Sequence, residues 1–291
     1  MSTSRPRDSA RAREAFARQL ARDLDLRSSG VGRAFARVPR ESFVGPGPWW
    51  VSSGSGYLPT PDADPAHLYG DVRIALDPTR ELNNGRPYTH ARWLDALAPA
   101  PGAVVVQVGA GTGYYTAILA ELVGPEGRVT AIEVDRQLAN AARTHLAPWR
   151  QVSVLERSAV GLDPGEFDAA YWNAGSTQLD PIWLDRLRPG GAIVVPLTVE
   201  RGERFGAALC VRRGRGGFSA RFLEPEPTLL VFSYVGGRDP ARESELERAF
   251  ARGGHLDVRS LRRDAHAPGS TCWLHRQGEC LSRELAKESV R

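Results

Sequence analysis

The stretch Val104 to Tyr115 constrains the fold more than any other part of the chain. It reads VVVQVGAGTGYY and continues into the apolar-periodic run Thr116 to Leu122. A valine-rich run, then glycines, then a helical pattern indicates a buried strand that turns sharply into a helix. Gly109, Gly111 and Gly113 permit positive φ and a close approach of the backbone to a ligand. The turn therefore predicts a ligand site at the unpaired N–H groups of the helix N-terminus.

The spacing of these glycines bears on the kind of ligand. A dinucleotide fingerprint is G-x-G-x-x-G, whose third glycine falls where this chain has Tyr114. The pattern here is G-x-G-x-G, and Glu133 closes the next predicted strand, Arg128 to Ile132. An acid at that place is typical of a residue that accepts hydrogen bonds from ribose hydroxyls. The pattern favours a nucleoside-bearing ligand, and Tyr114 argues against a nicotinamide-dependent oxidoreductase.

Alternating strand and helix patterns continue beyond the turn. Asp135 is a candidate helix cap, and a further helix is predicted over Leu179 to Leu187. The remaining predicted strands are Val152 to Leu155, Asp168 to Trp172, Ala192 to Leu197 after the turn Pro189 to Gly191, and then Phe205 to Val211, Phe218 to Leu223 and Leu229 to Val235. Such alternation predicts an α/β fold with a parallel, doubly wound, Rossmann-like sheet.

The two ends of the chain lie outside this rhythm. Helices are predicted over Ser9 to Leu26, capped by Ser9, and from Val31 to just before Pro39. The irregular segment Gly45 to Asp71 holds four tryptophan and tyrosine side chains, which either serve function or cover a sheet edge. A short strand is predicted over Val72 to Leu76 and a helix over Tyr88 to Leu97.

Three segments are expected. Residues 1–80 form a helical and aromatic cap, 81–235 a ligand-binding domain, and 236–291 a C-terminal extension with a helix near Ser244 to Phe250 and a charged terminal helix. Four residues near that end, Cys272, His275 and Cys280 with His266, have the chemistry of zinc ligands. Their spacing fits no closed four-ligand pattern, so the sequence favours ordinary thiols and no metal site.

Composition limits the class of protein. The 291 residues carry 38 basic and 34 acidic side chains, and this mild excess is spread along the chain. We therefore expect no dedicated nucleic-acid binding. No apolar run is long enough to span a bilayer, the N-terminus lacks the apolar region of a signal peptide, and three cysteines cannot form a disulfide framework. A cytoplasmic protein without a membrane partner is expected, and no feature defines its oligomeric state.

Several segments resemble one enzyme class. Beside the glycine turn, these are RVPRESFV (Arg37 to Val44), NNGRPYTHARWLDAL (Asn83 to Leu97) and FDAAYWNAGSTQLDPIWLDRLRPGGAIVVPL (Phe167 to Leu197). Together they resemble class I S-adenosylmethionine-dependent methyltransferases and, within them, the protein-L-isoaspartate (D-aspartate) O-methyltransferase family. The resemblance implies a Rossmann-like sheet completed by an antiparallel β-hairpin, with S-adenosyl-L-methionine as cofactor.

The resemblance also assigns cofactor residues. Gly109, Ala110, Gly111 and Gly113 would border the methionine portion, Glu133 the ribose and Val134 the adenine; Ser158 and Ala159 would hold the adenine amino group, and Asn173 would end a strand above the cofactor. The chain departs from the family at two of these places. Ser158 stands where the family has an acidic residue, and Gln107 stands where an acid is common in the first strand.

The acceptor is expected at the loop Asn83 to Tyr88. A carboxylate acceptor is ionised at neutral pH and needs no general base, and methyl transfer mainly requires alignment. Where the family has a Ser-x-Pro pattern with a serine at the substrate, this chain has Gly85, Arg86 and Pro87. Asn84 and Arg86 are the candidate catalytic groups, through an amide hydrogen bond and a bidentate ion pair, and Asn83, Gly85, Pro87, Tyr88 and His90 are the candidate substrate-binding residues. The alternatives are a tight turn for the loop, and for His90 a helix residue with a satisfied hydrogen bond rather than a catalytic base.

These observations predict a carboxyl O-methyltransferase that acts on an aspartyl or isoaspartyl group of a peptide or protein. The missing serine leaves two other hypotheses open. One is a specialised methyltransferase of peptide or small-molecule natural-product biosynthesis, and the other is a cofactor-binding protein without catalysis.

Overall fold

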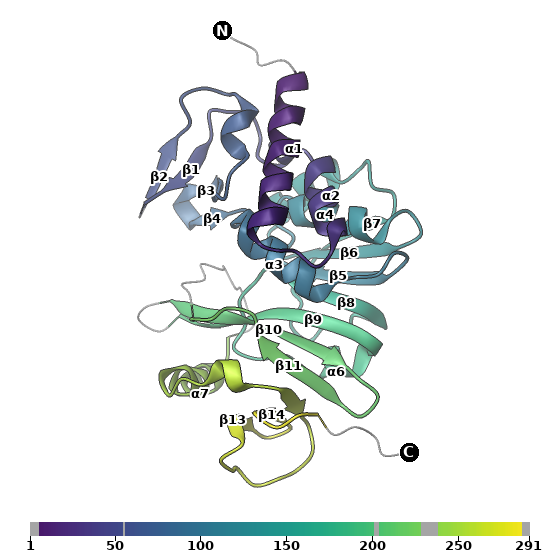
Figure 1. The fold of residues 1–291 in the computed structure, drawn as a ribbon, viewed down its shortest axis with the longest axis vertical. Helices are drawn as coiled ribbons and strands as arrows, with labels where there is room; N and C mark the ends of the chain where they lie inside the picture. The colour runs from purple at the N-terminus through teal and green to yellow at the C-terminus, as the bar shows by residue number, and fades with distance from the viewer. Residues whose placement is uncertain (1–5, 55, 201–203, 228–237, 287–291) are drawn as a thin grey trace. The chain divides into compact units, whose positions relative to one another are not determined.

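The computed structural model of the chain describes residues 6–54, 56–200, 204–227 and 238–286 (Figure 1). The chain forms two compact units. The first contains residues up to Ala103 together with Gly109–Arg157, and the second contains Val104–Val108 together with the residues from Ser158 onward. These units join separate stretches of sequence, so the three expected segments stay a prediction. In the described ranges, no helix has the length and apolar character needed to cross a membrane.

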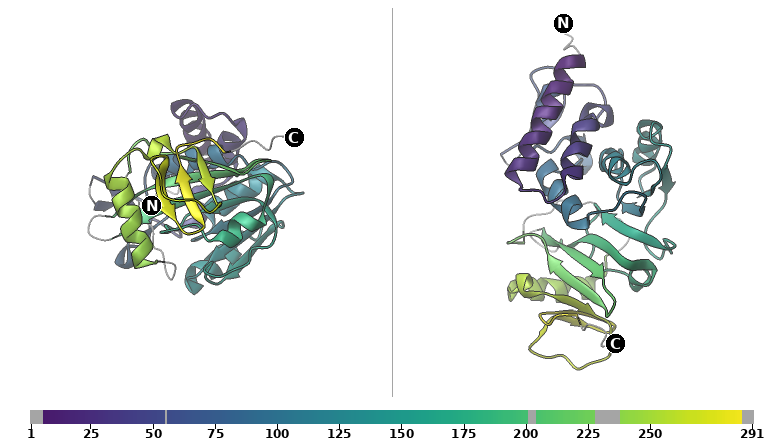
Figure 2. Two further views of the ribbon diagram at one scale, coloured as in Figure 1. Left: turned by 90° about the horizontal axis from the view of Figure 1, so that it is seen from below. Right: turned by 45° about the vertical axis from the view of Figure 1, so that its right-hand side comes forward.

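The first unit begins with two packed helices. Helix α1 spans Pro6–Asp23 and α2 spans Ser29–Arg37, and they lie side by side (Figure 2). Both predicted helices are confirmed, but Ser9 does not cap α1. The helix begins at Pro6, whose fixed φ suits the first turn, so Ser9 lies within it. Ser28 caps α2, because its side chain accepts a hydrogen bond from the Gly30 N–H at 3.2 Å.

The aromatic segment expected to be irregular contains a β-hairpin. Strands β1, Trp50–Ser53, and β2, Gly56–Pro59, pair antiparallel, and a 3-10 helix, η2, follows at Pro65–Leu68. Trp49 packs with Leu68 and Ile74 in a small core of its own. The segment folds because these apolar side chains find burial next to the hairpin, which local composition did not show.

A second short antiparallel pair follows this small core. Strand β3 spans Ala75–Asp77 and pairs with β4, Leu82–Asn83. The strand predicted over Val72 to Leu76 therefore begins later and is shorter than expected. The 3-10 helix η3, Pro78–Arg80, connects the two strands, and the side chain of Asp77 caps it by accepting from the Thr79 N–H.

The rest of the first unit follows the predicted α/β rhythm. Its elements are α3 (Pro87–Leu97), α4 (Tyr114–Val123), β6 (Arg128–Glu133), α5 (Arg136–His145) and β7 (Val152–Glu156). Strands β6 and β7 are parallel, with Glu133 opposite Glu156. The predicted cap is confirmed, since Asp135 Oδ1 accepts from the Leu138 N–H at 2.9 Å.

The second unit holds the other strands. Its first elements are β5 (Val104–Val108), β8 (Phe167–Trp172), α6 (Pro181–Arg186), β9 (Leu187–Val199), β10 (Phe205–Arg213) and β11 (Phe218–Phe222). Strand β8 pairs parallel with both β5 and β9, and β9, β10 and β11 continue antiparallel. The expected antiparallel hairpin is thus confirmed as β10 and β11.

Three details of the second unit differ from the prediction. Helix α6 is shorter than expected because Asp180 caps it, accepting from the Ile182 N–H at 3.1 Å. The Pro189 to Gly191 turn lies within the bounds of β9. The strand expected over residues 229–235 lies outside the described residues.

The C-terminal part adds a helix and three short strands. Helix α7 spans Pro240–Ala251, confirming the predicted helix, and packs on β9 and β13 (Figure 2). The 3-10 helix η4 covers His255–Asp257, and the strands are β12 (Ser260–Arg262), β13 (Cys272–Arg276) and β14 (Glu279–Ser282), which extend the sheet in the order β11, β12, β14, β13. The prediction of a charged terminal helix is wrong for the residues up to Ala286. Strands β13 and β14 form a hairpin there, and its two-residue turn contains Gly278 at φ +75°.

Candidate functional site

The glycine turn has the geometry that its sequence predicts. Gly109, Gly111 and Gly113 have φ of +76°, +57° and +98°, values that residues other than glycine rarely adopt. Gly113 is also required for packing, since a Cβ there would lie 2.8 Å from Leu146 Cδ1. The turn leads directly into α4, so the helix N-terminus opens at this point.

The turn is tied to the end of β6. The N–H groups of Gly109 and Ala110 both donate to the Ile132 carbonyl, at 2.9 and 3.1 Å. The Glu133 carboxylate then accepts the Gly111 N–H through Oε2 at 2.7 Å and the Asp135 N–H through Oε1 at 3.0 Å. The predicted meeting of the acid and the glycine turn is therefore present within this unit.

The surroundings of Glu133 suit a polar ligand with an apolar part. Glu133 is 6% exposed, and burial raises its pKa above the ordinary value even though two N–H groups donate to it. The next residue, Val134, is 45% exposed. The Glu133 carboxylate can accept hydrogen bonds from ribose hydroxyls, and the exposed Val134 side chain next to it can pack against the attached base.

The predicted cofactor residues of the second unit occupy local turns. Asn173 follows β8, donates its N–H to the Val108 carbonyl at 2.8 Å, and accepts from Gln107 Nε2 at 3.3 Å. Ser158 Oγ accepts from the Val160 N–H at 3.1 Å, and Ala159 is buried. The assignment of Ser158, Ala159 and Asn173 to a cofactor stays a prediction.

The predicted acceptor loop in the first unit is held by Arg40, a residue that no sequence pattern marked as part of a site. The side chain is fully buried. Its Nη1 donates to the carbonyl oxygens of Leu68 and Gly70, at 2.8 and 3.3 Å. Its Nη2 donates to the Val72 carbonyl at 2.7 Å, and it reaches the loop at Asn84 Oδ1, 3.1 Å away, and at the Gly85 carbonyl, 3.2 Å away. A buried guanidinium thus fixes the loop through neutral oxygens.

Asn84 is oriented by this network. Its Oδ1 accepts from Arg40 and from the Ile74 N–H, at 3.1 and 3.0 Å. Two donors at one atom define which end of the amide is the oxygen. The buried Nδ2 has no hydrogen-bond partner within the described part of the chain. Asn83 differs, because its Oδ1 accepts from the Gly85 N–H at 2.9 Å and shapes the turn.

Asp71 holds the start of α3. It pairs with Arg86 Nη2 at 2.5 Å and accepts the Tyr88 N–H at 2.9 Å. The Arg86 charge is therefore already paired, although its side chain is 57% exposed, and Pro87 is buried at the first helical position. Tyr88 Oη donates to Asp23 at 2.6 Å, and burial together with that carboxylate raises the pKa of Tyr88 to about 12. This arrangement favours Asn84 over Arg86 as the group that meets an acceptor.

His90 lies in helix α3, as one interpretation of the sequence had it, and its side chain is buried. Its ring stacks on Tyr115 with centroids 3.7 Å apart. Burial, followed by the nearby Arg40 charge, lowers the pKa of His90 to about 3, so the imidazole is neutral at pH 7. Gly85 has φ +71°, and a Cβ on it would lie 2.8 Å from His90 Cδ2 and closer to Nε2.

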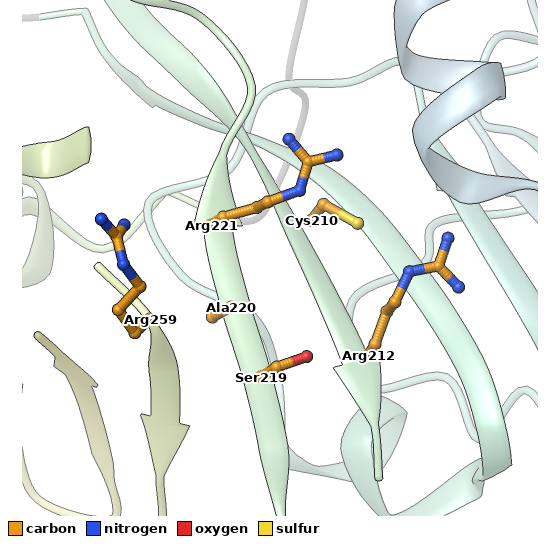
Figure 3. Close-up of a pocket in the computed structure, with 6 residues that line it drawn as sticks. All are labelled: Cys210, Arg212, Ser219, Ala220, Arg221 and Arg259. Carbon is orange, nitrogen blue, oxygen red and sulfur yellow. The ribbon is translucent and has the colours of Figure 1, made fainter. Parts of the chain in front are cut away.

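A shallow cavity of about 300 Å³ lies on β10 and β11 in the second unit (Figure 3). Its lining comprises Cys210, Arg212, Ser219, Ala220, Arg221 and Arg259. Arg259 is engaged locally, since its Nη1 donates to the Leu256 carbonyl at 2.6 Å. None of the residues predicted for cofactor or acceptor lines this cavity.

Comparisons with known proteins agree with the fold. The sequence model of the protein-L-isoaspartate(D-aspartate) O-methyltransferase family matches residues 66–221, just over half of the chain. A protein-L-isoaspartate O-methyltransferase of Methylorubrum extorquens is 30% identical over 237 residues, which cover 80% of this chain and 93% of that protein. One of Methanopyrus kandleri is 33% identical over 192 residues, covering 64% of this chain and 77% of that protein.

A solved structure resembles the fold as well. The beta-aspartate methyltransferase of Plasmodium falciparum, solved in complex with S-adenosyl-L-homocysteine, superposes with a TM-score of 0.58 and 17% identity, covering 78% of this chain and 99% of that chain. The match bears out the expected α/β, Rossmann-like fold. The family model ends before α7, so the three C-terminal strands lie beyond the matched residues.

Proposed function

This chain belongs to the protein-L-isoaspartate(D-aspartate) O-methyltransferase family, and on that premise we propose that it transfers a methyl group from S-adenosyl-L-methionine to the side-chain carboxylate of an aspartyl or isoaspartyl residue in a peptide or protein. The observation that carries the cofactor assignment is the closure of Glu133 on the glycine turn through the Gly111 N–H. This hydrogen bond supports a ribose-binding role for Glu133, because it holds the carboxylate near the N-terminus of α4 in a chain of this family.

The residues of the first unit fit the cofactor. The backbone of Gly109 to Gly113 borders the methionine portion, Glu133 accepts from the ribose hydroxyls, and exposed Val134 covers the adenine. Two backbone N–H groups orient the Glu133 carboxylate before any ligand arrives, which lowers the ordering cost of binding. When bound, S-adenosyl-L-methionine supplies a methyl group on a sulfonium, a leaving group that needs no protonation.

The acceptor loop supplies alignment rather than proton transfer. A substrate carboxylate has an ordinary pKa of about 4, so it is ionised at neutral pH and attacks without a general base. Asn84 Nδ2 donates to one of its oxygens and holds it in place. Arg40 binds the opposite end of the same amide, which polarises it and strengthens the donor. Neutral His90 takes no proton from the acceptor.

One observation favours a specialised acceptor as a second candidate. The family's serine position is Gly85, and His90 fills the space where a serine side chain would lie. The hydrogen bond to the acceptor then comes from Asn84 at a different place in the loop. This shift favours a modified peptide, such as one made in natural-product biosynthesis, over isoaspartyl groups in general.

The test uses the full chain with methyl-labelled S-adenosyl-L-methionine, an isoaspartyl peptide and its aspartyl counterpart. Calorimetry with S-adenosylhomocysteine runs in parallel. Base-labile label on the isoaspartyl peptide supports the general acceptor. Bound S-adenosylhomocysteine without label on either peptide counts against the general acceptor and is the result expected for a specialised acceptor or for a cofactor-binding protein without catalysis. Failure to bind S-adenosylhomocysteine overturns the cofactor assignment.

A further inference from the structure

The fold gathers four metal-binding side chains at the C-terminal strands. Donor atoms of His266, Cys272, His275 and Cys280 all lie within 4.8 Å of one another. Their spacing along the sequence matches no pattern of a four-ligand zinc site. Strand pairing in the fold brings the four side chains together. His275 on β13 stands opposite Cys280 on β14, Cys272 begins β13, and the loop 263–271 returns His266 to the same place.

The distances suit a tetrahedral metal site. Cys272 Sγ lies 3.6 Å from His266 Nε2 and 3.8 Å from His275 Nδ1. Zinc bonds of about 2.3 Å to sulfur and about 2.0 Å to nitrogen separate neighbouring donors by roughly 3.3 to 3.8 Å. Cys272 and Cys280 are both thiols rather than a disulfide. The four side chains therefore need little movement to enclose one ion.

The neighbouring groups orient the ligands. His266 Nδ1 lies 2.9 Å from the Asp264 carbonyl, so this nitrogen carries the proton and Nε2 presents its lone pair toward Cys272. The Gly269 N–H donates to Cys272 Sγ at 3.4 Å, which favours the thiolate. The rings of His266 and His275 meet edge to face, with centroids 4.7 Å apart. The two rings therefore lie in contact beside Cys272.

We propose that His266, Cys272, His275 and Cys280 bind one Zn²⁺ in a closed Cys₂His₂ site. A site of two thiolates and two imidazoles selects zinc rather than magnesium or calcium, which prefer oxygen ligands. Binding of zinc releases the two thiol protons. Four protein ligands leave no open position, so the ion is structural. It anchors the loop 263–271 to the β13–β14 hairpin, which lies beyond the residues that the family model matches.

The first test is the zinc content of the full-length protein, measured by inductively coupled plasma mass spectrometry after gel filtration. One zinc per chain is expected. Cys272→Ser and His275→Ala should reduce the content to background. Cys210→Ala is the matched control, because this buried cysteine lies on β10 outside the cluster, and it should retain one zinc. Cobalt substitution should give a thiolate-to-cobalt charge-transfer band that Cys272→Ser weakens.

A second measurement on the unaltered chain guards against variants that fail to fold. Removal of zinc by a chromogenic chelator should make Cys272 and Cys280 reactive to alkylation together and lower the melting temperature. A zinc-free protein with the same melting temperature and reactive thiols would overturn the proposal, as would a Cys272–Cys280 disulfide in non-reducing peptide maps. Neither readout uses methyl transfer, so this site and the proposed enzyme function stand or fall separately.

Discussion

The imidazole of His90 fills the space that a side chain on Gly85 would occupy, and it is held there by stacking on Tyr115. The loop that resembles the family's Ser-x-Pro pattern is therefore not a loop from which a serine was simply lost. A glycine at positive φ and a buried ring behind it form one packed arrangement.

Gly85→Ser should destabilise the protein rather than restore a family activity. Positive φ alone costs about 1–2 kcal/mol for a non-glycine residue, and overlap with His90 adds to it. Urea unfolding measures the loss. Gly45→Ser is the matched control, since Gly45 has φ +68° with open space around its Cβ position, and it should show the conformational cost alone. In a His90→Ala background, Gly85→Ser should cost no more than this control; an unchanged unfolding free energy for Gly85→Ser itself would contradict the prediction.

Asn84→Asp should reduce catalysis while preserving the fold. The aspartate keeps an oxygen for Arg40 and for the Ile74 N–H, but it removes the Nδ2 donor and repels a carboxylate acceptor. A hydrogen bond to a charged group is worth about 1.5–3 kcal/mol, so kcat/KM for a peptide that the protein methylates should fall roughly 10- to 100-fold. Melting temperature checks the fold, and Asn140→Asp on exposed α5 is the control. Equal kcat/KM in the two variants would remove Asn84 from the acceptor site.

Glu133→Gln should weaken S-adenosylhomocysteine binding and make the stability of the protein less dependent on pH. Because burial raises the pKa of Glu133 above 4.5, its contribution to stability is complete below pH 4.5 and is lost as the pH rises through the folded-state pKa. A neutral glutamine avoids that loss with rising pH, but its single oxygen can accept only one of the Gly111 and Asp135 N–H groups, so urea unfolding of the variant should depend less on pH than that of the unaltered protein.

Binding of S-adenosylhomocysteine is the second measurement for Glu133→Gln. Loss of charge-assisted bonds to a ribose is expected to raise the calorimetric Kd roughly 10- to 100-fold. Glu156→Gln is the control, because Glu156 stands opposite Glu133 on β7 but pairs with Arg143 at its half-exposed side chain. An unchanged Kd for Glu133→Gln would place the ribose elsewhere.

Arg40→Lys should destabilise the protein strongly. Lysine has one nitrogen where the guanidinium uses two to reach five oxygens, so several buried carbonyl groups would lose their partner. Broken buried networks cost about 3–5 kcal/mol, measured by urea unfolding. Arg37→Lys, in an exposed pair with Glu121, should change the free energy by less than about 0.5 kcal/mol. Similar losses for the two variants would contradict the role given to Arg40.

The features that could be predicted from the sequence are those that depend on residues close together in the chain. The glycine turn, the acid that closes β6 and the Asp135 cap each depend on a few adjacent positions, and each is present in the structure. The hairpin in the aromatic segment was missed because it depends on burial of Trp49 against Leu68 and Ile74. Local composition carries no sign of that contact.

Long-range convergence explains the other omissions. Arg40 meets acceptors 28 to 45 residues further along the chain, and no spacing rule joins such positions. The Cys and His cluster likewise depends on which strand faces which, and a sequence pattern without a known register cannot supply that. The tight turn at Asn83 and the helix position of His90 were among the alternatives that the sequence left open, whereas the stacking of His90 on Tyr115 was not predicted.

The Arg40 network has a consequence for transplanting specificity between relatives. The stretch 83–90 is contiguous and short, which makes it an inviting cassette for exchange. Its conformation, however, is held by a guanidinium from the segment 37–44 that also grips the carbonyls of 68–72. A chimaera that exchanges residues 83–90 alone would combine a foreign loop with the native Arg40 contacts. A working exchange must therefore transfer the segments 37–44, 68–72 and 83–90 together.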